Sequence, residues 1–221
     1  ISTCPAIREN LLPSDHPDVT SLYFNLAGIH KDRHNYDKAE ALYQRVLEVE
    51  EKILGPNHLY VSDSLFNLAG ICWSKGDYSR AESLYQRSLA IREKALGPNH
   101  PEVARCLSGL ASIYREKGEI DKAEPLYKRA LVVLEKSLGS DHQDVARCLT
   151  AMAIIPERES DYGQAEVLYQ RALKITEKAL GPNHPDVANV LNNLVRVYWS
   201  QGDNTKAEII SQRALAIHEA A

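Results

Sequence analysis

The sequence lacks every short motif that marks a common catalytic or metal site. It contains no Gly-rich phosphate loop, no CxxC, no HExxH and no GxSxG. It also has no run approaching the 18 or so uninterrupted apolar residues that a membrane-spanning helix needs. Residues 1–15 carry neither the basic start nor the apolar centre of a signal peptide. We therefore expect a non-enzymatic protein without a cofactor, a metal or a membrane partner.

An excess of basic residues is missing as well. The chain has 26 Lys and Arg against 30 Asp and Glu, which gives a formal net charge of −4 at pH 7. Proteins that bind nucleic acid usually present a basic face. RNA binding by a helical repeat is therefore disfavoured, and we expect no nucleic-acid partner.

One turn sequence, in contrast, occurs five times in closely related forms. "ALGPNHPEVA" begins at Ala95 and returns as "ALGPNHPDVA" at Ala179. A second block, "KAEALYQRV" from Lys38, recurs with the same spacing. A fixed period of 20–50 residues marks a repeat array, and two blocks in each period indicate two elements in each repeat. The histidine of the turn recurs every 42 residues, at His16, His58, His100, His142 and His184.

Both elements of a repeat have the pattern of an amphipathic helix. In the third repeat, apolar residues recur at gaps of 3 and 4 from Pro101 to Gly118, and again from Glu119 to Gly139. Gly97 suits the left-handed C′ position that ends a helix, and Pro101 fits the first turn of the next one. Either Asn99 or His100 could cap that helix. The predicted fold class is all-α.

The recurring histidines and cysteines do not form a metal site or a disulfide on this pattern. Equivalent positions lie one repeat apart, roughly 10 Å, whereas zinc ligands sit about 2 Å from the metal. Cys106 and Cys148 are also one repeat apart, and a disulfide needs Cα atoms within about 7 Å. We expect the histidines to be structural turn residues and Cys72 to be a small core residue. Reduced thiols favour a cytoplasmic setting.

The repeats resemble the tetratricopeptide family. Large-small doublets such as Leu110-Ala111, the small residue Ala123 and the aromatic Tyr127 recur at fixed positions. The 42-residue form, with "LYQRALxIxEKALGPNHPDVAxxLNNL", is similar to the repeat array of kinesin light chains, and also to nephrocystin-3 and many bacterial proteins. The resemblance covers residues 6–219 and implies an α-solenoid, a right-handed superhelix of helix pairs. We expect residues 1–221 to form a single array. Its predicted repeats are 17–55, 59–97, 101–139, 143–181 and 185–221. Residues 6–12 look like the end of the second helix of a preceding repeat.

In tetratricopeptide folds the first helices line a concave groove, and two sets of residues fall there. Asn25, Asn67 and Asn193 share one position, where the resemblance implies hydrogen bonds to the backbone of an extended peptide. Gly109 and Ala151 interrupt this set. Arginine clusters in the last three repeats and can bind carboxylates in a bidentate way. The full predicted peptide-binding set is Asn25, Asn67, Asn189, Asn193, Arg105, Arg115, Arg147, Arg158, Arg196, Trp73 and Trp199.

Each set has a simpler alternative. The arginines could form surface ion pairs with neighbours such as Glu116 and Glu157, worth a fraction of a kcal/mol. Trp73 and Trp199 could pack in the core at a helix end instead of anchoring a partner. Pro156 stands late in a first helix, where it removes a hydrogen bond, so we predict that this helix kinks or ends near Ile155.

The sequence therefore predicts a scaffold of the kinesin light chain cargo or adaptor type. Its groove would hold an extended, acidic segment of another protein. The alternative is an architectural spacer, or a self-associating arm, of a larger signalling or sensor protein.

Overall fold

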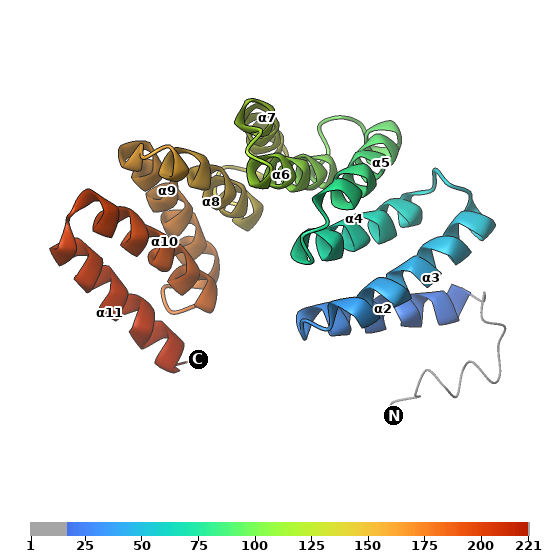
Figure 1. The fold of residues 1–221 in the computed structure, drawn as a ribbon, viewed down its shortest axis with the longest axis horizontal. Helices are drawn as coiled ribbons and strands as arrows, with labels where there is room; N and C mark the ends of the chain where they lie inside the picture. The colour runs from blue at the N-terminus through green and yellow to red at the C-terminus, as the bar shows by residue number, and fades with distance from the viewer. Residues whose placement is uncertain (1–16, 221) are drawn as a thin grey trace. The chain divides into compact units, whose positions relative to one another are not determined.

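The computed structural model describes residues 17–220, and within them every regular element is an α-helix (Figure 1). This confirms the predicted all-α fold. Residues 6–12, predicted to be the tail of a preceding helix, and His16 lie outside the described residues. In chain order the helices are α2 (Pro17–Asp32), α3 (Tyr36–Leu54), α4 (Leu59–Ser74), α5 (Tyr78–Leu96), α6 (Pro101–Glu116), α7 (Ile120–Leu138), α8 (Gln143–Arg158), α9 (Tyr162–Leu180), α10 (Pro185–Gln201) and α11 (Asn204–Ala220).

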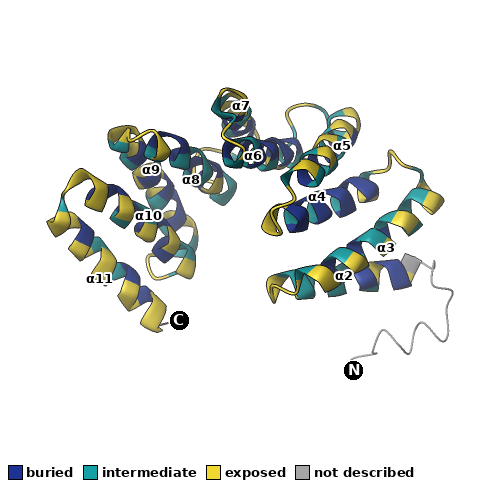
Figure 2. Cartoon of the chain, in the orientation of Figure 1, coloured by how far each residue is buried: buried dark blue, intermediate teal, exposed yellow. Residues whose placement is uncertain are grey.

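The helices form two compact units, residues 1–98 and 99–221. Unit 1 contains α2 to α5, and unit 2 contains α6 to α11. Inside each unit, the first helix of a repeat packs against the second helix of the same repeat. The second helix then packs against the first helix that follows, as α3 does with α4, α7 with α8 and α9 with α10. Buried residues lie on these packed faces and exposed residues on the opposite ones (Figure 2).

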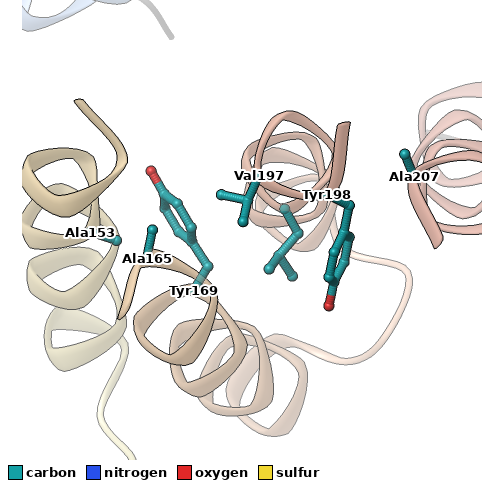
Figure 3. Close-up of a cluster of buried hydrophobic side chains, with 7 residues drawn as sticks. Ala153, Ala165, Tyr169, Val197, Tyr198 and Ala207 are labelled. Atoms are coloured by element: carbon teal, nitrogen blue, oxygen red, sulfur yellow. The ribbon is translucent and has the colours of Figure 1, made fainter. Parts of the chain in front are cut away.

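The small and aromatic residues that recur in the sequence form the core. Tyr169 of α9 lies between Ala153 of α8 and Val197 of α10, with Ala165 beside it (Figure 3). Small side chains let neighbouring helices approach closely, and the tyrosine ring fills the space between them. The same alanine and tyrosine positions are buried in the other repeats, at Ala39, Ala81, Ala123 and Ala207 and at Tyr43, Tyr85 and Tyr127.

The recurring histidine is the N-cap of each first helix from α4 onward. Its backbone is extended, and its ring nitrogen Nδ1 accepts a hydrogen bond from the backbone N–H two residues later. At His142 the donor is the N–H of Asp144, at 3.1 Å. The cap satisfies one of the N–H groups that the first turn of a helix leaves without a partner. This confirms the structural reading of the histidines and identifies His100, not Asn99, as the cap of α6.

Removing one of these caps should lower stability. We expect His142→Ala to reduce the free energy of unfolding by about 1 kcal/mol, because the N–H of Asp144 loses its acceptor. His142→Asn should lose much less, since asparagine is a preferred N-cap residue. Urea unfolding followed by circular dichroism measures both. Equal stability of the alanine variant and the wild-type protein would contradict the capping role.

The glycine that follows each of the second helices α3, α5, α7 and α9 does not have the predicted left-handed helical conformation. Gly97 has φ 86° and ψ 158°, and Gly55, Gly139 and Gly181 are nearly identical. The positive φ was expected, but the ψ value is wrong for the left-handed helical region. The chain leaves the helix directly in an extended direction, toward the proline or serine that follows. This region of φ and ψ is essentially open to glycine alone.

Pro156 does not end its helix early. Helix α8 continues to Arg158, so the predicted end near Ile155 is wrong. The proline is buried, and the turn beyond it is closed by the N–H of Asp161, which donates to the carbonyl of Pro156 at 2.8 Å. A proline only two residues from the end of a helix removes one backbone hydrogen bond and leaves the remaining turns intact. The kink that was the other part of this hypothesis stays a prediction.

Candidate peptide-binding surface

Arg115 was predicted to face a ligand, but it is part of the core of unit 2. Only 5% of its surface is exposed. Its Nη1 donates to the hydroxyl of Tyr127 at 3.1 Å and to the carbonyl of Ala151 at 3.0 Å. Nε and Nη2 both donate to Oε1 of Glu116, at 3.2 and 2.8 Å. Because these partners come from α6, α7 and α8, Arg115 joins three helices and is not available to a peptide.

Arg158 and Arg196 continue this network between successive first helices. Arg158 of α8 donates to the second carboxylate oxygen of Glu116, at 3.0 Å. Arg196 of α10 makes a bidentate pair with Glu157, through two bonds of 3.0 Å. Burial opposes ionisation of Glu116, yet hydrogen bonds from Arg115 and Arg158 hold its pKa below the ordinary value. The ion-pair alternative therefore describes these three arginines, and we call the network the arginine–glutamate ladder.

Arg105 and Arg147 are exposed, as Arg158 and Arg196 are, but they differ in that their acidic partners lie on the same helix. Each pairs with an acidic residue one turn away on its own helix, Glu102 at 3.0 Å and Asp144 at 3.2 Å. Such i,i+3 surface pairs contribute little to stability, so a ligand carboxylate can replace the acidic partner at small cost. Asn189 of α10 is also exposed and occupies the same position one repeat later. Arg105, Arg147 and Asn189 thus form one row, which we call the Arg105 row.

The asparagine position shared by Asn25, Asn67 and Asn193 is used unequally. Asn25 is exposed, whereas Asn67 and Asn193 are half-buried. The amide of Asn67 donates to the carbonyl of Asp63 at 3.0 Å, and its oxygen accepts from Lys31 Nζ at 3.3 Å. Asn67 therefore already links α2 and α4. The predicted contact of these side chains with a peptide backbone stays a prediction.

Neither tryptophan is buried. Trp73 is 39% exposed and Trp199 is 72% exposed. Core packing at the helix end therefore does not describe Trp199, and most of its ring is open to solvent. Its predicted role as an interface anchor is not tested by this geometry.

A pocket of about 440 Å³ in unit 1 was not predicted from the sequence. Its size falls within the range of about 300–1,000 Å³ that is usual for ligand sites. Two half-buried acidic residues line it, Glu50 of α3 and Asp63 of α4, and burial raises the pKa of the Glu50 carboxyl. One sequence feature could have indicated this pocket: the position that is Arg92 in the second repeat is Glu50 in the first, so its charge is reversed. The pocket is lined by Thr20, Ser21, Phe24, Asn25, Val49, Glu50, Ile53, Leu54, Tyr60 and Asp63.

Two further properties bear on function. Within residues 17–220, no helix is long and apolar enough to cross a membrane, and no three His, Cys, Asp or Glu side chains are grouped to hold a metal ion.

Cys72, Cys106 and Cys148 are buried free thiols, as predicted. Burial raises the pKa of Cys148 to about 11, which makes it a poor nucleophile at neutral pH.

Comparisons with known proteins agree with the helix-pair architecture. The family model described as tetratricopeptide repeat matches residues 18–94, 80–136, 108–176 and 157–220. The crystal structure of BtubC (BKLC) from P. vanneervenii is 25% identical, with a TM-score of 0.73, over 98% of this chain and 81% of that one. A putative kinesin light chain from Podospora anserina, with nearly identical repeats, is 23% identical, with a TM-score of 0.70, over 92% of this chain and 96% of that one.

A more distant structure is that of a Rap protein complexed with competence and sporulation factor. It is 16% identical, with a TM-score of 0.79, over 90% of this chain and 53% of that one, and this likeness concerns the fold alone. No curated protein matches the sequence. Since the family model covers most of the chain, the protein belongs to the tetratricopeptide repeat family, whose members are typically protein-interaction scaffolds.

Proposed function

We propose that this protein is a non-enzymatic scaffold that binds an extended, acidic segment of a partner protein along the Arg105 row. The observation that carries the proposal is the recurrence of an exposed polar side chain at one position of α6, α8 and α10. Neighbouring first helices lie roughly 10 Å apart, and an extended peptide advances about 3.3 Å per residue. A carboxylate at every third residue of the peptide would therefore match successive members of the row.

The electrostatics of the rest of unit 2 support this choice of residues. Arg115, Arg158 and Arg196 make hydrogen bonds between successive first helices, so using them for a ligand would break contacts that hold these helices together. The pairs that Arg105 and Arg147 make with Glu102 and Asp144 lie within one helix and are solvent-screened, so exchanging them for a ligand carboxylate costs little. The guanidinium fork then makes charge-assisted hydrogen bonds to the incoming carboxylate.

Charge reversal along the row tests this function. We expect Arg105→Glu/Arg147→Glu to weaken binding of a fluorescein-labelled peptide, with Asp at every third residue and apolar residues between, by tenfold or more. Fluorescence anisotropy at two salt concentrations provides the measurement. A matched control, Lys128→Glu/Lys174→Glu, reverses the same number of exposed charges on the second helices α7 and α9. Undiminished binding by the row variant would contradict the proposal.

The same variants separate the scaffold from the architectural alternative. Sedimentation of the wild-type chain and of the row variant reports self-association. If the row variant changes its oligomeric state and no peptide affinity is lost, the row is a contact between copies and the architectural role is favoured. We place the scaffold in the cytoplasm, since its three described cysteines are buried as reduced thiols.

A further inference from the structure

The pocket in unit 1 and the equivalent place in the second repeat share an aromatic wall. Phe24 packs edge-on against Tyr43, with ring centroids 5.2 Å apart, and Phe66 packs in the same way against Tyr85, at 5.3 Å. Phe24 and Phe66 are 42 residues apart and therefore occupy the same position in their repeats. The two rings are held alike because Tyr43 and Tyr85 are both buried.

In the second repeat a cation of the chain itself occupies this place. Arg92 is 2% exposed, and its guanidinium lies 4.8 Å from the centroid of the Phe66 ring. Its Nη2 donates to Oδ1 of Asp63 at 2.7 Å, and its Nε donates to the hydroxyl of Ser62 at 3.2 Å. The aromatic face and the carboxylate together make a site for a guanidinium, which the fold fills internally.

In the first repeat the aromatic wall is present but the cation is replaced by a carboxylate. Glu50 stands where Arg92 stands one repeat later, and Ser21 stands where Asp63 does. Among the described residues, Glu50 has one hydrogen-bond partner, Ser64, whose hydroxyl donates to it at 2.7 Å. Burial raises its pKa, with a further contribution from Asp63. Burial outweighs the hydrogen bond from Ser64 and the favourable contribution of His58, so the Glu50 carboxylate is stabilised by a cation that enters the pocket.

We propose that this pocket binds the guanidinium of an arginine side chain in a partner peptide, paired with Glu50 and placed against Phe24. The arrangement reproduces the Arg92 site with the cation supplied by the ligand. Exposed apolar side chains at the rim, Ile53, Leu54 and Tyr60, cover the aliphatic part of that arginine and its apolar neighbours. This site lies in unit 1 and selects a positively charged side chain, whereas the Arg105 row is proposed to bind carboxylates. The inference therefore does not depend on the proposed function.

A short peptide tests the charge preference directly. The probe is a fluorescein-labelled Ala-Leu-Arg-Leu-Ala with blocked ends, and its partner carries neutral citrulline in place of arginine. We expect the arginine peptide to bind at least tenfold more tightly than the citrulline peptide, and Glu50→Gln to remove that difference. The matched control is Glu48→Gln, which changes an exposed glutamate of the same helix outside the pocket lining.

A second variant fills the pocket from within. Ser21→Asp/Glu50→Arg copies the Asp63 and Arg92 pair into the first repeat, and we expect it to fold normally and to lose the arginine peptide. Circular dichroism and thermal unfolding confirm folding. The proposal is overturned if the wild-type chain does not bind the arginine peptide at concentrations up to about 1 mM. It is equally overturned if citrulline binds as well as arginine, or if Glu50→Gln has no effect.

Discussion

Replacing Arg115 with alanine should destabilise unit 2 more than any other change to a predicted site residue. We expect Arg115→Ala to lower the free energy of unfolding by about 3 kcal/mol. The substitution removes the bonds to Tyr127, to the carbonyl of Ala151 and to Glu116 at once. It also leaves a cavity among three helices, and the partly buried Glu116 loses its bonds from Arg115 while it keeps the one from Arg158.

The control for this prediction lies on the same helix. Arg105→Ala removes an arginine whose side chain is 45% exposed and whose pair with Glu102 is solvent-screened, so it should change stability by less than about 0.5 kcal/mol. Urea unfolding of the two variants compares them directly. Similar losses at Arg105 and Arg115 would show that the buried network does not stabilise the fold.

Replacing Gly139 with alanine should have the next largest effect. Gly139 has φ 89° and ψ 155°, a backbone conformation that side chains with a Cβ avoid. An added Cβ would meet no atom within 4 Å, so the whole cost arises from backbone strain and not from a clash. We expect Gly139→Ala to lower the free energy of unfolding by about 1–3 kcal/mol.

Gly163 provides the matched control in the same unit. It lies in the first turn of α9, and a Cβ there would meet Asp161 Oδ1 at an ordinary 3.6 Å. Gly163→Ala should therefore leave stability unchanged or raise it by about 0.5 kcal/mol, because alanine restricts the unfolded chain. Thermal unfolding of both variants decides between strain and a general effect of adding a methyl group. Equal behaviour of the two variants would exclude the strain explanation.

The fold was predictable because the information that specifies it is local and repeated. The spacing of His58, His100, His142 and His184 marks each corner, and the alanine and tyrosine positions mark each packed face. The cap itself was left open between Asn99 and His100, since only coordinates show which side chain accepts the N–H. The ψ value of Gly97 was missed for a similar reason, because a glycine reveals that φ is positive but not where the chain goes next.

The site was less predictable because burial depends on neighbours that are distant in sequence. Arg115 and Arg105 look alike on one helix, yet Arg115 bonds to Tyr127 and to α8, while Arg105 lies on the exposed face and pairs with Glu102 of its own helix. Glu116 and Glu157 were recognised as alternative partners, and the structure uses both. Glu50 was not predicted as a site residue. Its role becomes visible only by comparison with Arg92 in the next repeat and with an aromatic ring from another helix.

The arginine–glutamate ladder also has a consequence for how such a protein can evolve or be rebuilt. Arg196 faces Glu157 because the fourth repeat precedes the fifth, and the position equivalent to Glu157 in the third repeat is Arg115. A chain in which the third and fourth repeats were exchanged would bring two guanidiniums together. The turns between repeats are nearly identical in sequence, yet the repeats that they join are not interchangeable. A chain with exchanged repeats would lose stability wherever like charges then face each other.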